Sequence, residues 1–263
     1  NGSCSNALVD ITVNPIYLDV QLGVWLEGPM ALVFGNGYLP SMRSDLNVSR
    51  SVLPGEANSN MPSGQPYSAA PWNYFGTEGV GWTDSDYQNF EADNGGLRVV
   101  DWVLVSFRTG IAASTTFKKA AAMVFENGSV AFPDPCVLSI SSPTMAYVVI
   151  EHRNHMGVMS DVPVAITNGQ FNYDFRIQDS YNNTSFGQKQ IFPGQYAMYA
   201  GDISQVGDLG SYDINGDDKI PWEPENGKFS HYSLTDTNLD GDTNGADKAL
   251  WFNNFGFFSG VPR

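Results

Sequence analysis

The sequence predicts an all-β protein, an antiparallel β-sandwich of immunoglobulin-like architecture with a small C-terminal subdomain. Three observations predict this fold class. Short runs of β-branched and aromatic residues recur between turn residues, no long helical period interrupts them, and 263 residues can bury one large core. We expect an N-terminal extension at 1–19, the β-sandwich domain at 20–198 and a tail at 199–263.

The N-terminal extension carries a strand signal of its own at residues 8–13, ahead of the first strand pattern of the main body at 17–27. An extended segment of this kind can complete the sheet of a neighbouring copy, where alternate side chains fill pockets. The side chains that would do so are Leu8, Ile11 and Val13. Repeated head to tail, such a contact builds a filament, which makes the chain a candidate homo-oligomer or homopolymer.

The two cysteines, Cys4 and Cys136, offer an alternative for this segment. A disulfide between them would hold the segment within its own sandwich and would stabilise the fold by roughly 5 kcal/mol in the chain-entropy model. The other alternative for the cysteines is a pair of free, buried thiols.

Residues 35–98 form a long excursion that is rich in Gly, Pro, Ser and Asn and lacks a sustained period. Its aromatic residues are either a platform on which sugars stack or the packing that holds a long loop in place, which is the commoner use. These residues are Trp72, Tyr74, Phe75, Trp82, Tyr87 and Phe90.

Further strands are expected in the body of the sandwich, at 99–108, 120–126, 130–132, 147–152, 162–167 and 171–177. Asn127-Gly128 is a hairpin signal between two of them. Asn-x-Ser/Thr patterns make Asn47, Asn127, Asn182 and Asn183 candidates for N-glycosylation.

A twelve-residue run in the tail has the ligand spacing of a calcium loop. Oxygen-bearing side chains stand at positions 1, 3 and 5, glycine at 6, a carbonyl donor at 7 and a closing carboxylate at 12. These positions are Asp236, Asn238, Asp240, Gly241, Asp242 and Asp247. A short helix is expected directly afterwards, at 246–252.

A second, less regular loop precedes it, with Asp213, Asn215 and Asp217 at positions 1, 3 and 5. Lys219 would offer its carbonyl at position 7, and Glu225 (or Glu223) would close the loop. The prolines at 221 and 224 are expected to keep a helix from starting at once. The two loops together predict two Ca²⁺ sites.

No catalytic motif is visible, so the chain is not expected to be an enzyme. His152 and His155 stand three apart, which in a strand places them on opposite faces, and they are expected to hydrogen-bond carbonyls with Arg153 rather than to bind a metal. The acid pairs Asp84/Asp86 and Glu91/Asp93 are expected to be ordinary surface pairs.

The net charge of −15 argues against a nucleic-acid partner and suits an extracellular protein that meets divalent cations. No run of eighteen apolar residues exists, so no membrane span is expected.

Two stretches of the chain resemble known families. The paired acidic loops resemble a dockerin. The ordered series 24–29, 100–105 and 149–159 resembles a β-rich module of large secreted bacterial surface proteins that are often labelled haemagglutinin- or haemolysin-like. The resemblance leaves out residues 1–19, and it implies an extracellular, calcium-stabilised sandwich with an adhesive or structural duty and no reaction.

The predicted function is therefore an extracellular structural or adhesive surface protein that self-assembles through its N-terminal strand. The alternative is a carbohydrate- or protein-binding module of the dockerin type. Because no Pro/Thr/Ser linker separates the tail from the sandwich, the tail is expected to pack on its own domain.

Overall fold

The computed structural model describes residues 16–32, 37–47, 60–134, 138–140, 144–182, 184, 186–204 and 212–263. The predictions for Cys4, Cys136, Leu8, Ile11, Val13 and Asn183 lie outside these residues. Within the described part the protein is mostly β, as expected, and none of the helices there is long and apolar enough to cross a lipid bilayer.

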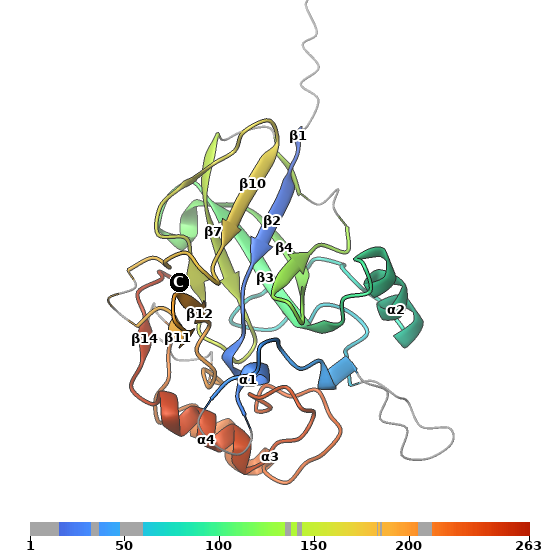
Figure 1. Ribbon diagram of the computed structural model, residues 1–263, viewed down its shortest axis with the longest axis vertical. Coiled ribbons are helices and arrows are strands. Elements are labelled where there is room, and N and C mark those ends of the chain that lie inside the picture. The colour runs from blue at the N-terminus through green and yellow to red at the C-terminus, as the bar shows by residue number, and fades with distance from the viewer. Residues whose placement is uncertain are drawn as a thin grey trace, which may run out of the picture.

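One eight-stranded sheet dominates the fold (Figure 1). In spatial order it consists of β10 (Gln170–Asp174), β2 (Asp19–Gly23), β5 (Ser129–Ala131), β4 (Thr116–Phe125), β3 (Val99–Arg108), β7 (Met145–Glu151) and β8 (Val158–Met159), while β9 (Val164–Ala165) also pairs with β7. The expected strand at 99–108 and the Asn127-Gly128 hairpin between β4 and β5 are confirmed.

The sheet differs from the expected antiparallel arrangement in one pair, because β10 runs parallel to β2. The other strands of the sheet lie between β2 and β10 in the sequence. A crossover rather than a hairpin therefore joins these two strands, and a parallel pair is allowed. Leu22 of β2, Phe171 of β10 and Ile150 of β7 share one buried core, although β7 and β10 lie far apart in the strand order. The sheet must therefore curl around that core.

Three short strand pairs supplement the large sheet. They are β1 (Ile16–Tyr17) with β6 (Ser139–Ile140), β11 (Lys189–Phe192) with β12 (Gln195–Ala197), and β13 (Tyr212–Asp213) with β14 (Phe258–Ser259). One short helix, α1 (Glu27–Met30), follows β2 and is buried throughout.

The excursion after residue 60 covers the outer face of β3 and β4. Tyr67, Tyr87 and Trp102 are buried together there, with the Tyr67 hydroxyl donating to the Trp102 carbonyl (2.7 Å) and the Trp102 indole donating to the Tyr87 hydroxyl (2.9 Å). All ten residues of β3 are buried, because side chains cover both faces of the strand. Packing is therefore the main use of the excursion's aromatic residues, although Phe75 is 80% exposed.

The excursion also contains a helix that the sequence reading did not anticipate, α2 (Asp84–Asp93). Thr83 and Asp86 form a capping box at its start, which is a helix-start signal visible in the sequence. Glu91 is buried and accepts hydrogen bonds from the Val99 N–H (2.8 Å) and the Asn47 side chain (2.6 Å). Asp86 and Glu91 therefore have structural partners, and the burial of Glu91 corrects the expectation that Glu91 and Asp93 form an ordinary surface pair.

The tail contains two helices, α3 (Lys219–Glu225) and α4 (Gly245–Asn254). The helix expected at 246–252 is confirmed by α4, but α3 contradicts the expectation that prolines would prevent a helix. Pro221 lies in the first turn of α3, where the N–H groups have no partner within the helix, so a proline there costs no helical hydrogen bond.

The tail packs on the sheet, as expected. Tyr212, Trp251 and Val261 of the tail are buried against Val149 of β7 and Met159 of β8 in one apolar cluster. The tail is therefore part of the same folded body as the sheet.

Candidate functional site

The acidic loop from Asp236 to Asp247 is tightly wound by its own hydrogen bonds. Asp236 accepts from the N–H groups of Gly241 (2.9 Å) and Asp240 (3.1 Å). Gly241 has φ of 84°, a conformation that glycine adopts without strain, and this permits the turn at position 6. The positions predicted from the spacing therefore come together in one closed loop.

Asp247 closes the loop from the start of α4. One of its carboxylate oxygens accepts from the N–H groups of Thr237 (2.8 Å) and Asn238 (3.2 Å), and the other accepts from the Asn244 N–H (2.7 Å). The last of these bonds is half of a capping box, so one side chain both starts the helix and fixes the loop.

The carboxylates of this loop are deeply placed. Asp236 and Asp247 are fully buried, and Asn238 is nearly so. Burial raises the pKa of Asp247 to about 6. Burial also raises the pKa of Asp236 well above its usual range, and the neighbouring Asp247 and Asp240 reinforce this shift against the opposing charge of Arg153.

By donor chemistry the loop fits a hard divalent cation, since every predicted ligand offers oxygen. No group of three or more His, Cys, Asp or Glu side chains within the described residues has the arrangement of a metal centre. A calcium loop also uses amide and main-chain oxygens, which such a group does not include. Calcium at this loop therefore stays a prediction.

The first acidic loop is held differently. Asp213, Asn215 and Asp217 lie together, because Asn215 donates to Asp213 (2.9 Å) and accepts from the Asp217 N–H (2.6 Å). Asp218, at the position where a calcium loop has glycine, is buried and accepts from the N–H groups of Ile203, Ser204 and Asn215. Burial raises the pKa of Asp218 to about 6.

The residues expected to close the first loop have other partners on α3 or just after it. Glu225 accepts from Lys228 (2.6 Å), and Lys219 forms an ion pair with Glu223 (2.8 Å). Because α3 begins at Lys219, the helix carries Glu225 two turns beyond the loop. The prediction of a calcium ion here has less structural support than at the second loop.

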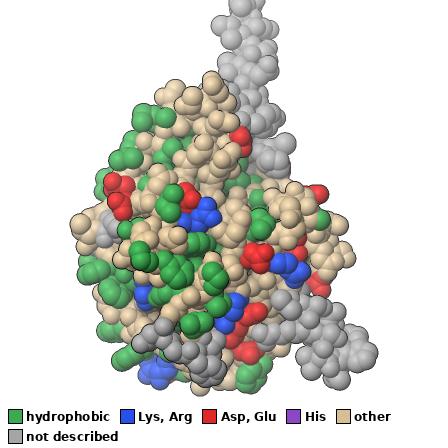
Figure 2. All heavy atoms as spheres, viewed as in Figure 1, with side chains coloured by type: hydrophobic (Ala, Val, Ile, Leu, Met, Phe, Trp, Pro, Cys, Tyr) green, Lys and Arg blue, Asp and Glu red, His purple; other side chains and the backbone are tan. Residues whose placement is uncertain are grey.

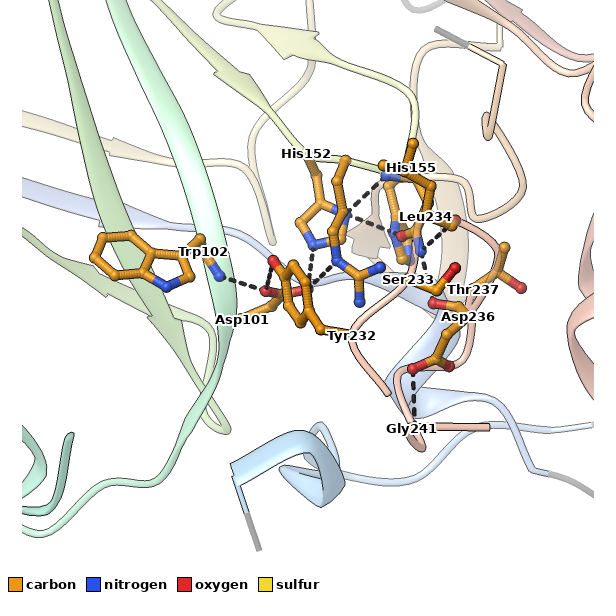
Figure 3. Close-up of polar contacts among 12 residues, drawn as sticks. Asp101, Trp102, His152, His155, Tyr232, Ser233, Leu234, Asp236, Thr237 and Gly241 are labelled. Atoms are coloured by element: carbon orange, nitrogen blue, oxygen red, sulfur yellow. Dashed lines mark hydrogen bonds and ion pairs between the residues drawn. The ribbon is translucent and has the colours of Figure 1, made fainter. Parts of the chain in front are cut away.

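A buried polar cluster joins the second loop to the sheet (Figure 3). Asp101 is its centre: its carboxylate accepts from Arg153 Nε (2.8 Å) and the Tyr232 hydroxyl (2.7 Å) and lies 3.1 Å from His152 Nε2. The pairing of β3 with β4 shifts register between Val99 and Asp101, and a bulge of this kind re-aims a side chain. Burial alone would raise the pKa of Asp101, but Arg153, His152 and Tyr232 hold it well below its usual range.

The hydrogen bonds of the two histidines assign their tautomers. Because His155 Nε2 accepts from the Gly28 N–H (3.1 Å), the proton of its neutral ring lies on Nδ1, which faces the side-chain amide oxygen of Asn154 (2.8 Å) and His152 Nδ1 (3.0 Å). His152 then carries its proton on Nε2 and donates it to Asp101. Burial lowers the pKa of both rings, which favours these neutral forms.

Asn154 makes the direct link to the acidic loop. Its side-chain amide donates to the main-chain carbonyls of Leu234 (3.0 Å) and Asp236 (2.6 Å) (Figure 3). The main chains also touch, since a Cβ added to Gly28 would lie 1.8 Å from the Thr237 carbonyl oxygen. The end of β7 and the start of α1 thus hold the first residues of the loop in place.

The structural role expected for the histidines is confirmed, and their expected carbonyl partners are confirmed in part. His155 contacts the side-chain carbonyl oxygen of Asn154, whereas the other partners of the two histidines are a carboxylate, each other and a main-chain N–H. Main-chain carbonyls are bonded by Asn154 instead. The sequence reading also missed Asp101 and Tyr232. The signal for Asp101 was present, because it is the one acid within the apolar run 99–107.

The candidate glycosylation residues differ in accessibility. Asn47 is 8% exposed and its amide is engaged by Glu91, so the folded chain does not present it. Asn127 and Asn182 are exposed. Their modification stays a prediction for a source that glycosylates such sites.

The sequence matches no known family profile and no curated protein. By structure the chain is similar to part of a type II cohesin–X-dockerin complex from Acetivibrio cellulolyticus, a C-terminal interface mutant, with a TM-score of 0.37 and 18% identity over 60% of this chain and 82% of that one. An N-terminal interface mutant of that complex gives a TM-score of 0.35 and 17% identity over 58% of this chain and 80% of that one. Likeness at this level is weak and carries no conclusion about function.

Proposed function

We propose that this chain is an extracellular structural or adhesive module whose loop from Asp236 to Asp247 takes up Ca²⁺ and thereby stabilises the whole domain. The observation that carries the proposal is the pair of hydrogen bonds from Asn154 to the carbonyls of Leu234 and Asp236. Through these bonds, an ion that orders the acidic loop also orders the segment that follows β7.

The charge balance of the loop supports a bound cation. Asp236 and Asp247 are fully buried with Asp240 close by. Among the described residues, Arg153 is the basic side chain whose charge partly offsets that of Asp236. Buried carboxylates are unfavourable unless they are paired or coordinate a metal. The ion would be held by the side chains of Asp236, Asn238, Asp240 and Asp247 and the carbonyl of Asp242, and it would supply positive charge and no reaction.

The charges on the surface argue against nucleic acid as a partner. Figure 2 shows basic side chains scattered among acidic ones on the face in view, without a broad basic area. With a net charge of −15, the chain lacks the electrostatic footprint that phosphate backbones require.

Calorimetric melting with calcium and with a chelator tests the proposal. A ligand at a hundred times its dissociation constant adds about 2.7 kcal/mol to the free energy of unfolding, so calcium should raise the melting temperature by several degrees. Asp240→Asn should remove most of that rise. Asp93→Asn, at an exposed site on α2, is the matched control and should keep all of it. Identical melting curves with calcium and with chelator would show the proposal to be wrong.

We propose further that the module self-assembles, with the N-terminal segment as the added strand. The strand order of the large sheet ends on β8 and β10, and an edge strand can accept a segment from another chain. Deletion of residues 1–19 should abolish fibres or oligomers seen by electron microscopy. Fibres of unchanged appearance after the deletion would refute strand addition.

A protein-binding module of the dockerin type is the second candidate. The observation in its favour is at the C-terminal end of α4, where Phe252 is 71% exposed and Phe255, directly after the helix, is 54% exposed, and both rings lie against Trp251. Exposed aromatic side chains that lie together mark interaction surfaces. Replacing both with alanine should weaken binding to a partner protein without changing the calcium-dependent melting temperature.

A further inference from the structure

A hollow of about 380 Å³ lies on the excursion that covers the outer face of β3 and β4. Its described lining includes three aromatic rings and two carboxylates: Tyr74, Phe75, Trp82, Glu78 and Asp134. None of these residues belongs to the acidic loops or to the polar cluster around Asp101. The volume is at the lower end of small-molecule sites, which are mainly aromatic or apolar with a few placed polar groups.

Among the described residues Phe75 is the most exposed of the large hydrophobic side chains, at 80%. It lines this hollow and also a second one of about 400 Å³ formed with the segment from Pro62 to Pro66. The ring therefore stands between two depressions and can cover an apolar ligand surface. A single exposed ring is ordinary on a protein surface, but this hollow also contains a buried polar group.

Glu78 supplies that polar group. It is 7% exposed, and its Oε1 accepts from the Tyr74 hydroxyl and from the Ala121 N–H (3.2 Å). Its other oxygen, Oε2, is buried without a hydrogen-bond partner among the described residues. A buried carboxylate oxygen without a donor is costly, so a ligand that brings a hydroxyl donor to it would gain a charge-assisted hydrogen bond.

We propose that this hollow binds one ring of a neutral glycan. A pyranose combines what the site lacks: an apolar C–H face for Phe75 and Trp82, and a hydroxyl donor for Glu78. Among the described residues that line the hollow none is basic, and its two carboxylates repel anionic sugars. An apolar ligand of the same size would leave Glu78 Oε2 unsatisfied.

Gly76 sets the space available next to Glu78. A Cβ at this position would overlap both Glu78 Oε2 and the Tyr74 hydroxyl oxygen. Its φ lies outside the left-handed region, so alanine is compatible with the backbone there. Gly76→Ala therefore displaces the Glu78 carboxylate and the Tyr74 hydroxyl from their places without straining the main chain.

The inference is tested with the full chain in calcium, first on an array of neutral and anionic glycans and then by calorimetric titration of the best neutral oligosaccharide. Phe75→Ala, Glu78→Gln and Gly76→Ala should each weaken binding by about tenfold or more, the change that a lost charged hydrogen bond or buried ring produces. Phe229→Ala, which removes another ring that is 67% exposed, is the matched control and should bind as the parent does.

Two outcomes would overturn the inference: no neutral glycan on the array gives a signal, or Phe75→Ala and Glu78→Gln bind as tightly as the parent. Phe75 is so exposed that its removal leaves the fold intact, so its result does not depend on the stability of the Glu78 variant. The inference gives a ligand to the adhesive role proposed above and rests on that role. A chain that melts higher with calcium but binds no sugar would overturn this inference alone.

Discussion

Asp101 shows how one side chain can hold two parts of a protein together. It lies on β3, yet its partners come from the segment after β7 and from the tail. Arg153, which is 1% exposed, has no hydrogen-bond partner for its two terminal nitrogens among the described residues. Its charge is compensated mainly by Asp101, and further by the nearby carboxylate of Asp236 and by the ring of Tyr232, which lies 4.1 Å from the guanidinium carbon.

Asp101→Asn should therefore be strongly destabilising. Removal of one partner from a buried ion pair leaves the other charge uncompensated, and this costs about 3–5 kcal/mol. Urea unfolding at neutral pH measures the loss, with Asp93→Asn on the surface as the control. A change as small as that of the control would mean that Arg153 finds compensation elsewhere.

His155 should make the stability of the protein depend on pH. Its pKa is lowered in the folded state, so between that pKa and the ordinary value of about 6.5 the unfolded chain binds more protons. The stability due to a neutral His155 is complete above about pH 6.5 and falls as the pH drops, by up to about 1.4 kcal/mol per pH unit.

The comparison of the parent with His155→Gln isolates this contribution. Asp218 and Asp247, whose pKa values are raised to about 6, give a slope of opposite sign in acid and are common to both proteins. Below pH 6.5 the parent should lose stability more steeply than the variant in urea titrations. Parallel pH profiles would contradict the neutral, buried state assigned to His155.

At the scale of elements, the two acidic loops share a spacing but use their sixth residue in opposite ways. Gly241 supplies a left-handed turn, and its N–H donates to the Asp236 carboxylate within the loop. Asp218 instead turns its carboxylate toward the main chain at residues 203 and 204. The second loop thus keeps the turn typical of a calcium loop, whereas the sixth residue of the first loop holds the neighbouring main chain.

Asp218→Gly, which restores the residue usual in calcium loops, should therefore destabilise the protein. The variant loses three main-chain hydrogen bonds to a buried carboxylate, and we expect a loss of about 2–4 kcal/mol. Thermal melting in chelator measures it. Unchanged stability, or a gain that appears only with calcium, would show that the first loop works as a metal site.

At the scale of the whole molecule, the tail belongs to the core. Tyr212, Trp251 and Val261 cover Val149 and Met159 on the outer face of β7 and β8, and the polar cluster around Asp101 adds buried hydrogen bonds to the same contact. A sheet without this cover would expose a large apolar patch.

A chain that ends at residue 198 should therefore not behave as an independent β domain. We expect it to aggregate or to give no cooperative melting transition, whereas the full chain should melt in a single transition. Scanning calorimetry and gel filtration of both chains measure this. A truncated chain that stays monomeric and melts cooperatively would support the boundary at 198/199 as a true domain boundary.

The sequence by itself determined the elements whose signals are local. The apolar, β-branched run within 99–108, the Asn127-Gly128 turn, the ligand spacing from Asp236 to Asp247 and the helix after it all depend on residues within about a dozen positions. Only the tertiary structure decided the rest: the parallel pairing of β2 with β10, the hydrogen bonds from the main chain to Asp218, and the contacts of Asp101 with His152, Arg153 and Tyr232. These features depend on contacts between distant segments and on the desolvation of the charges that they bury. Neither effect produces a periodic pattern in the sequence.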